Sequence, residues 1–590
     1  MNNKNMKRTL VSALVSASIL SQAGCSNVPN EDEPIVRWWD EGIAGLAYFG
    51  GKVLELYNNN FVDTNANYPE NVECSTGAEE NRMVDGNCND LDQTRMGSVG
   101  VRFGRNVSLE SAYPDENLMK PNPRLVSEVL MTRDGIKEVD FLSYWAAAWI
   151  QFMVHDWMAH QNSESEYHSV PLEEDDPLYS ELGPEMLIAK TIIDPSWSPY
   201  EGTPPAYVNR LTHWWDGSQL YGSDEETNRR LRTLQDGKLK LTEQGRLPVD
   251  PVTGEAVTGF AENWWLGLQM FHELFAKEHN AIAAMLKEAY PDWNDDQLFN
   301  KARMINAAIM AKIHTVDWTP SILNNPTAKL AMNADWDVVV GGNKKLRGVP
   351  FSLTEEFVAV YRMHPLIRDS VDIVNYQTGG LIENVPTEDQ AFRNAEGVLN
   401  DYGTANVFYS FGVTHPGQIT TNNFPKFLQN LRMPDGTVMD LAAVDILRDR
   451  ERGVPRYNEF RRQLHMPPIR DFTDLTPDVE LAEKLREVYD DDVEAIDVMV
   501  GQLAEGYRPD GFGFSDTTFR IFTMMAPRRF QGDRFYTNDF NNYVYTPEGM
   551  EWIKNADFKS VIVRHVQELR SAMANVGNPF FPWNTDSSNW

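Results

Sequence analysis

The chain has 590 residues, of which 42% are hydrophobic and 11% aromatic, and its formal net charge is −33. That length and hydrophobic fraction permit a large buried core, in one domain or in several. The negative charge disfavours nucleic acid and anionic lipid headgroups as partners. It identifies no partner, because a negative surface also keeps exported proteins soluble.

The first 24 residues have the pattern of a secretory leader. Cations among the first eight residues precede a run of small and apolar residues that is too short to span a bilayer. Ala-Gly before Cys25 is similar to a bacterial lipoprotein processing site, although Gln22 stands where that pattern usually has an aliphatic residue. Lipidation of Cys25 and a plain cleaved signal are the two alternatives. Either way, we expect an exported bacterial protein, periplasmic or anchored by lipid, with no transmembrane span.

The remaining segments predict a simple domain order. Residues 25–40 read as an acidic tether and residues 41–125 as an N-terminal region, in which the closeness of Cys74 and Cys88 predicts a disulfide. Two free thiols are the alternative. We expect residues 126–574 to form one catalytic domain and residues 575–590 to form an irregular tail.

Helical periodicity dominates the middle of the chain. Residues 139–160, 262–290 and 298–318 carry apolar side chains at helical spacing, whereas strand-like runs such as the valines at 338–340 are few. In the first of these segments Gln151 and His155 are four residues apart, so they share one helix face. The prediction is a mainly α-helical protein with a single large catalytic domain.

The segment from 211 to 222 offers oxygen atoms at alternate positions. Thr212, Asp216 and Ser218 alternate with aromatic and glycine residues, as in a loop that wraps a hard cation such as calcium. Asp156, next to His155, would add a carboxylate from the preceding helix. Taken alone such a string is more often a turn, so its weight comes from the combination.

Tyr361 and His364 form a second histidine motif. Ser352-Leu-Thr-Glu355 predicts a capping box that starts a helix, and Pro365 disfavours helix at the residue before it, so we expect His364 at the helix end. A histidine that only caps the helix is the alternative. Two such histidine faces across a flat haem would give one iron ligand and one group acting on peroxide, with a tyrosine nearby.

One further motif is rejected. His272-Glu begins like a zinc-protease helix, but Ala276 stands where the second histidine is required, so we interpret His272 as a packing residue.

Several long segments occur in a fixed order between about residue 82 and residue 537. They include Gln151-Phe-Met-Val-His-Asp-Trp157, the loop at 212–218, Lys312-Ile-His-Thr-Val-Asp-Trp318, Tyr361-Arg-Met-His364, and the arginine-rich segments at 448–462 and 528–535. In these the chain resembles the animal haem peroxidase superfamily, which includes myeloperoxidase and the cyclooxygenases. Within it, the sequence is most similar to the fatty-acid α-dioxygenases known from plants.

The resemblance implies haem b and calcium as cofactors and gives roles to individual residues. His155 matches the distal general acid/base, with Gln151 beside it, and His364 matches the proximal iron ligand. Tyr361 matches the tyrosine that the oxygenase branches convert to a radical. The implied calcium ligands are Asp156, Thr212, the carbonyl of Trp214, Asp216 and Ser218.

The resemblance also implies a fatty acid and O2 as substrates, with a trace hydroperoxide as activator. His314 and Arg529 match the pair that holds the fatty-acid carboxylate, and Arg528 is the neighbouring possibility. Such a pair would grip the carboxylate and place the α-carbon near the radical, so that O2 adds at C2.

Three positions depart from the mammalian peroxidases of this group. Val154 and Trp264 stand where those enzymes have acids ester-linked to haem, and Ala261 stands where they have a catalytic arginine. We therefore expect non-covalent haem and no halide oxidation. A fatty-acid α-dioxygenase is the leading hypothesis. The alternatives are a peroxidase or other lipid oxygenase, and an exported haem-binding protein without turnover.

Overall fold

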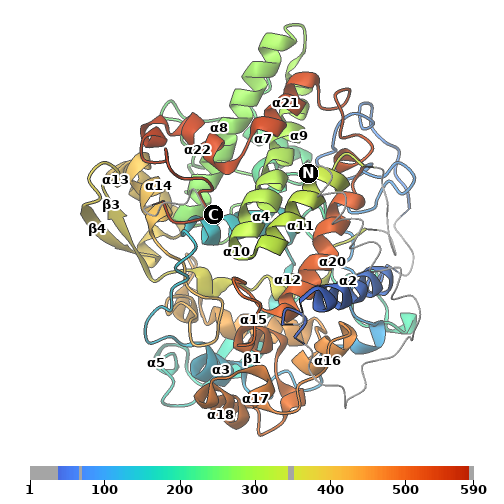
Figure 1. The fold of residues 1–590 in the computed structure, drawn as a ribbon, viewed down its shortest axis with the longest axis vertical. Helices are drawn as coiled ribbons and strands as arrows, with labels where there is room; N and C mark the ends of the chain where they lie inside the picture. The colour runs from blue at the N-terminus through green and yellow to red at the C-terminus, as the bar shows by residue number, and fades with distance from the viewer. Residues whose placement is uncertain (1–36, 41, 66–69, 343–350, 584–590) are drawn as a thin grey trace.

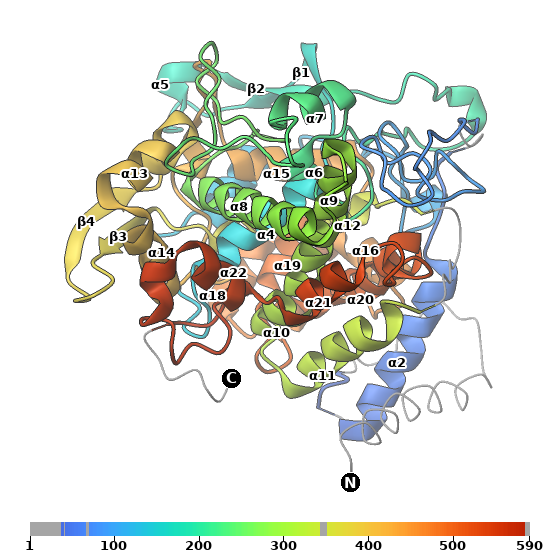
Figure 2. The ribbon, with the colours of Figure 1, turned by 90° about the horizontal axis from the view of Figure 1, so that it is seen from above.

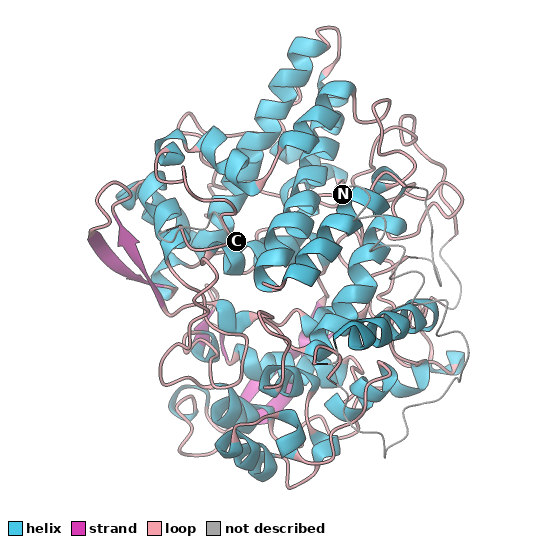
Figure 3. Cartoon of the chain, viewed as in Figure 1, coloured by secondary structure: helices cyan, strands magenta, loops and turns pink. Residues whose placement is uncertain are grey.

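The computed structural model describes residues 37–40, 42–65, 70–342 and 351–583. Helices dominate it, and its sheets are three antiparallel pairs: β1 (Asn162–Pro171) with β2 (Glu185–Thr191), β3 (Ser370–Val374) with β4 (Leu381–Pro386), and β5 (Leu431–Arg432) with β6 (Val438–Met439) (Figure 3). The predicted mainly α-helical class is therefore confirmed. Within the described residues, no helix has the length and apolarity that a membrane crossing requires.

Three helices form the centre of the molecule (Figure 1): α4 (Trp145–Trp157), α8 (Leu266–Ala289) and α9 (Asp295–Ile313). α4 is apolar on nearly every side, as expected of a helix enclosed by others. α9 begins at a capping box, in which Asn294 accepts a hydrogen bond from the Gln297 backbone and the Gln297 side chain accepts one from Asn294. The predicted helical segments thus exist: the first two are shorter than predicted, and the third begins three residues earlier, at Asp295, and continues through the π-helical turn His314–Trp318.

The second histidine motif folds differently from the prediction. Thr354, not Ser352, caps α12 (Glu355–Val360), because its hydroxyl accepts the backbone N–H of Phe357 at 3.2 Å. The helix ends before the motif, and His364 opens a separate 3-10 turn, His364–Leu366. Tyr361 and His364 therefore do not share one helix face. Pro365 favours this break, since proline suits the first turn of a helix and not its interior.

The predicted strand at 338–340 is also wrong. The segment Asp335–Val339 is a π-helical continuation of α11 (Pro326–Ala334). α11 has a strong start, where Asn325 accepts the backbone N–H groups of Thr327 and Ala328. A helix begun in this way can extend through β-branched residues, because propensity is a weak preference beside tertiary context.

One main hydrophobic cluster reaches from Trp38 to Trp583. The N-terminal helix α2 (Gly42–Asn59) lies at the edge of the molecule and packs on α20 (Asp516–Gln531) (Figure 2). Residues 575–583 are irregular, as expected, but Phe580 and Trp583 are buried in the cluster. The described part of the predicted tail is therefore packed. The leader, Cys25, tether residues 25–36 and tail residues 584–590 lie outside the described residues.

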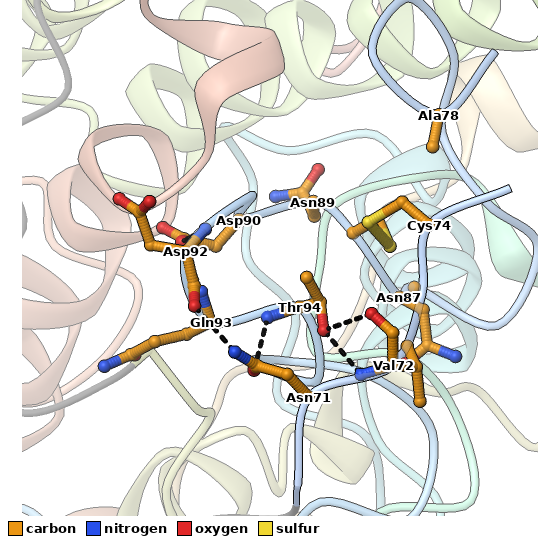
Figure 4. The surroundings of a disulfide bond; sticks show 12 residues. Asn71, Val72, Cys74, Ala78, Asn87, Asn89, Asp90, Asp92, Gln93 and Thr94 are labelled. Atoms are coloured by element: carbon orange, nitrogen blue, oxygen red, sulfur yellow. Dashed lines mark hydrogen bonds between the residues drawn. A yellow bond between two sulfur atoms is a disulfide. The ribbon is translucent and has the colours of Figure 1, made fainter. Parts of the chain in front are cut away.

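The N-terminal region contains the predicted disulfide. Cys74 and Cys88 are bonded, with their Cα atoms 5.9 Å apart (Figure 4). Thr94 stabilises the enclosed loop, because its hydroxyl accepts the Val72 N–H at 2.8 Å and donates to the Val72 carbonyl at 3.0 Å. The loop packs on the predicted calcium segment, where the Trp214 indole donates to the Gly86 carbonyl at 3.1 Å.

Candidate functional site

The first histidine motif lies on α4 as predicted. His155 is buried, its ring edge meets Phe260, and its Nδ1 has no partner among the described residues. Burial lowers the pKa of His155 to about 3, so the imidazole is neutral at neutral pH and can accept a proton. One turn earlier, the Gln151 amide oxygen accepts the Trp265 indole N–H at 2.5 Å, and its nitrogen donates to the Asn263 carbonyl at 3.2 Å.

His364 is held by a carboxylate that the sequence did not reveal. Its Nδ1 lies 3.0 Å from Oδ2 of Asp445, on α15 (Leu441–Glu451), and Arg362 lies 2.9 Å from the other carboxylate oxygen. Burial acts to raise the pKa of Asp445, but the neighbouring Arg362 and His364 outweigh it and hold the pKa below its usual range. A carboxylate on one ring nitrogen is how proteins orient a metal-binding histidine.

One residue of each histidine motif lines a common cavity: Gln151, from α4, and His364, with Trp264 and Trp265 forming part of the wall. His155, one turn after Gln151, is not among the lining residues. Most of the other lining residues are apolar, among them Ile367, Phe392, Leu428 and Leu441, and the polar ones are Asn263, Arg362 and Thr387. An apolar slot with an oriented imidazole fits haem. Trp264, at a position where an ester-forming acid would stand, presents an indole instead.

Tyr361, His314 and Arg529 meet at a second pocket. His314 opens the π-helix His314–Trp318 that follows α9, and Arg529 lies near the end of α20. All three line this pocket, together with Trp157 and Trp215. Arg528 is not among its lining residues, because its guanidinium lies over the ring of Phe61, 4.8 Å from the centroid.

The charges in this pocket suit an anion. Burial lowers the pKa of Arg529 to about 10, so the guanidinium stays charged at neutral pH, and its Nε and Nη2 have no partner among the described residues. Burial, and then the charge of Arg529, hold the pKa of His314 well below its usual value. Nδ1 of His314 accepts the Trp149 indole N–H at 3.2 Å, which leaves Nε2 as the protonated nitrogen. The pocket thus offers one cation and one neutral donor.

Tyr361 is fully buried in aromatic surroundings. Its ring lies 5.5 Å from that of Trp157 and 4.6 Å from that of Phe357, centroid to centroid. Burial raises the pKa of its hydroxyl, so the phenol keeps its proton across the physiological range.

The predicted cation ligands also converge. The Ser218 hydroxyl lies 2.9 Å from Oδ1 of Asp156, and the backbone N–H of Ser218 donates to the same oxygen at 2.6 Å. Oδ2 of Asp156 and the hydroxyl of Thr212 are buried without partners among the described residues. Burial, and then the charge of Asp216, raise the pKa of Asp156 to about 7. Paired buried carboxylates with spare oxygen atoms fit a cation.

Three features of the site were missed from the sequence. Asp445 lies three residues before the arginine-rich segment at 448–462, and Arg303 forms a buried ion pair with Asp216 at 3.1 Å. Trp157 and Trp215 are adjacent in sequence to predicted cation ligands, and this adjacency was the available signal. The other contacts join residues far apart in the sequence, and a single sequence carries no signal that would reveal them.

Comparisons with known proteins agree with this geometry. The model of the family "Animal haem peroxidase" matches residues 81–577. Alpha-dioxygenase PIOX of Pisum sativum is 38% identical, covering 85% of this chain and 83% of that protein, and Alpha-dioxygenase 2 of Arabidopsis thaliana is 36% identical, covering 86% and 85%.

Solved structures extend the similarity to the fold. A tyrosine-to-phenylalanine variant of Oryza sativa fatty acid alpha-dioxygenase with palmitic acid superposes with a TM-score of 0.86 at 32% identity, covering 99% of this chain and 98% of that one. Peroxidase A from Dictyostelium discoideum has a TM-score of 0.72 at 22% identity, covering 85% and 99%, and this match concerns the fold alone.

Proposed function

The chain belongs to the animal haem peroxidase family and is a haem-dependent oxidoreductase of its α-dioxygenase branch, and from this premise we propose that it inserts O2 at C2 of a fatty acid. One observation carries the proposal. Tyr361, His314 and Arg529 line a single pocket, while His364 and Gln151 line a separate cavity. The group that would hold a carboxylate and the group that would attack carbon thus face the same space.

In the cavity, His364 would ligate the iron of non-covalent haem b, and Asp445 would fix its ring. When bound, haem would supply a one-electron oxidant in the presence of a trace hydroperoxide, and Tyr361 would be the side chain that gives up the electron. His155 would move a proton between the peroxide oxygens, which its neutral imidazole allows. Gln151 would orient the same peroxide through its amide.

In the pocket, Arg529 and the Nε2–H of His314 would bind the carboxylate, and this contact would place C2 beside Tyr361. Two charge-assisted hydrogen bonds fix orientation, which can lower a barrier by several kcal/mol. The Tyr361 radical would remove one hydrogen from C2, O2 would add to the carbon radical, and the peroxyl radical would recover the hydrogen from Tyr361. The product is a 2-hydroperoxy fatty acid.

The test is oxygen uptake by haem-loaded protein with a C16 or C18 fatty acid, with mass spectrometry of the product. We expect a 2-hydroperoxide, and its loss in Tyr361→Phe, because phenylalanine has no hydroxyl to oxidise. Tyr543→Phe, at a tyrosine that is 78% exposed, is the control and should keep full uptake.

Three results would redirect the proposal. Oxygenation elsewhere on the chain would keep the radical and remove His314 and Arg529 as carboxylate ligands. Oxidation of phenols by peroxide without uptake would favour the alternative, a peroxidase. A protein that binds haem and does neither would be the non-catalytic alternative.

We also propose that Asp156, Thr212, the Trp214 carbonyl, Asp216 and Ser218 bind calcium. The unpartnered oxygen atoms of Asp156 and Thr212 support it. Arg303 already forms an ion pair with Asp216, so a bound calcium ion would share the Asp216 carboxylate with this guanidinium. Calcium here would tie α4 to the loop that packs on the disulfide.

Removal of calcium should lower the melting temperature, because a ligand that binds only the folded state adds about 2.7 kcal/mol at one hundred times its Kd. We expect EGTA to lower Tm in wild-type protein and added calcium to restore it, with a smaller response in Thr212→Val. Thr253→Val, at an exposed threonine, is the control. An unchanged Tm in EGTA, together with no bound calcium by elemental analysis, would contradict the site.

Export is part of the same proposal. The disulfide supports an oxidising compartment, where such bonds persist. The mass of the mature N-terminal peptide shows whether Cys25 carries a lipid anchor.

A further inference from the structure

The guanidinium of Arg529 lies over two indoles that meet edge to face. Its central carbon is 4.5 Å from the ring centroid of Trp157 and 4.5 Å from that of Trp215. Trp157 also neighbours Tyr361, with ring centroids 5.5 Å apart, and the two indoles are 5.6 Å apart. The cation that would bind substrate therefore contacts Trp157, an oxidisable ring beside the proposed radical, and Trp215, which adjoins Trp157.

We propose that Arg529 has a second role, in which its charge confines the radical to Tyr361 by making Trp157 and Trp215 difficult to oxidise. This inference rests on the proposed function of Tyr361. The chemical problem is general: an indole next to a tyrosyl radical can give it an electron, and the radical is then lost from the position where it reacts with substrate.

The escape step has two forms, and the structure opposes both. In the first, Trp157 gives one electron to the Tyr361 radical, so that a tyrosinate and an indole radical cation remain. A positive charge on the ring would then face the guanidinium, and the attraction of ring and cation would become repulsion. The positively charged indole radical is therefore disfavoured at both Trp157 and Trp215.

In the second form, the indole also loses its N–H proton and becomes a neutral radical. That step needs an acceptor for the proton. The Nε1–H groups of Trp157 and Trp215 are buried and have no acceptor among the described residues. The neutral radical is therefore not reached by a local proton transfer.

The charge on Arg529 is available for this role. The guanidinium forms no ion pair with a carboxylate of the described residues. Its pKa of about 10, lowered by burial, leaves it protonated at neutral pH. In the substrate-free pocket no carboxylate pairs directly with this charge, and Asp156 and Asp533 act on it only from further away; Tyr361 then has no C–H bond to attack. A bound carboxylate would weaken the electric field of Arg529. At that moment, however, the α-carbon of the substrate would lie next to Tyr361 and could react with its radical.

Escape would have a route onward. Trp215 stacks on Phe530 at 5.2 Å, and Phe530 meets Tyr536 at 5.3 Å and Trp336 at 5.8 Å. If Trp215 were oxidised, it could thus take an electron in turn from further oxidisable side chains. Confinement at the first indole prevents this loss.

The test uses haem-loaded full-length protein and hydrogen peroxide, without fatty acid, so that carboxylate binding plays no part. Freeze-quenched samples are examined by electron paramagnetic resonance, and peptides are examined by mass spectrometry for oxidised tryptophan. Wild-type protein should give a tyrosyl signal with Trp157 and Trp215 intact. Arg529→Gln should give an indolyl signal and at least tenfold more oxidation at Trp157 or Trp215.

Three further variants separate the causes. Arg529→Lys keeps a cation and should restore the tyrosyl signal, and Arg529→Gln with Trp157→Phe should return the radical to tyrosine. Arg520→Gln is the matched control, since Arg520 is a buried arginine of α20 that lies over Phe49 and does not line the pocket. A tyrosyl signal alone in Arg529→Gln, or an indolyl signal in wild-type protein, would overturn the inference.

The proposed function fails in a different way. If wild-type protein and Tyr361→Phe give the same signal, Tyr361 is not the radical site, whatever the Arg529 variants show. If Arg529→Gln does not fold, the Arg529→Lys protein and the wild type can still overturn the inference, because both carry the charge and an oxidised Trp157 in either would contradict it.

Discussion

Single side chains in this protein have charge states set by burial. His155 and His314 are neutral because burial lowers the pKa of each, whereas Arg529 remains charged in the same interior. The difference follows from their ordinary values, since arginine begins six units above histidine. A neutral imidazole for proton transfer and a permanent cation for an anion can therefore stand close together.

Asp335 shows what burial costs when no partner compensates it. Burial raises its pKa to about 7, and Oδ2 has no partner among the described residues. Between pH 4 and pH 7 the folded state then holds a proton that the unfolded state releases. The free energy of unfolding should fall as pH rises across that window, by roughly 1.4 kcal/mol per pH unit from this group.

Asp335→Asn should remove that dependence. We expect its Tm to match wild type near pH 4 and to exceed it at pH 8, measured by calorimetry. Asp510→Asn, at an exposed aspartate, should show no such divergence. A wild-type advantage at pH 8 would mean that the carboxylate of Asp335 is needed in its charged form.

At the scale of elements, one helix serves three sites. His155, Asp156 and Trp157 are consecutive on α4, and each successive side chain is turned by about 100°. Asp156 belongs with the cation loop and Trp157 with the pocket of Tyr361, while His155 lies one turn after Gln151, the residue of α4 that lines the haem-type cavity. A shift of α4 would therefore disturb all three sites together.

α8 is fixed to the C-terminal helices α21 (Pro547–Asn555) and α22 (Phe558–His565) through one buried carboxylate. Glu278 accepts Trp552 Nε1 at 2.8 Å, Arg564 Nη1 at 2.5 Å and His565 Nε2 at 2.6 Å. Glu278→Ala should cost about 3–5 kcal/mol, because it leaves the partners of a buried ion pair uncompensated.

The change should appear as faster amide hydrogen exchange across 547–565 and a lower Tm. Glu551→Ala removes an exposed pair with Lys554, whose side chains are 61% and 75% exposed, and should change neither. Unchanged exchange in Glu278→Ala would show that apolar packing alone holds α21 and α22.

At the scale of the molecule, both ends of the described chain close on one core. Trp38 donates its indole N–H to Asp516 on α20 at 2.9 Å, and Trp583 packs so tightly on Gly412 that a Cβ there would lie 2.1 Å from its ring. Phe580 meets Trp149, which donates to His314. The C-terminal segment thus supports the pocket from behind.

Phe580→Ala should therefore weaken both stability and substrate binding. A fully buried phenylalanine cut to alanine typically costs 3–5 kcal/mol, and the cavity would loosen Trp149 and His314. We expect a lower Tm and a higher KM for the fatty acid in oxygen uptake. Tyr200→Ala, at a side chain that is 98% exposed, should alter neither. A lower Tm with an unchanged KM would separate the segment from the pocket.

The sequence by itself determined the helical class, the disulfide, and the candidate residues on α4, at 212–218, at 361–364 and at 528–529. Periodicity, turn chemistry and ordered motifs are local signals, so one chain is enough to read them. It misplaced the helix around Tyr361 and the segment 335–340, where tertiary contacts outweighed local preference.

Only the tertiary structure decided which candidates act together. It placed Asp445 against His364, separated Arg528 from Arg529, and set Arg529 over Trp157 and Trp215. These relations join residues far apart in sequence, and they follow from how helices pack rather than from any pattern along the chain. Burial, which sets the charge of His155, His314 and Arg529, is likewise a property of the packed molecule.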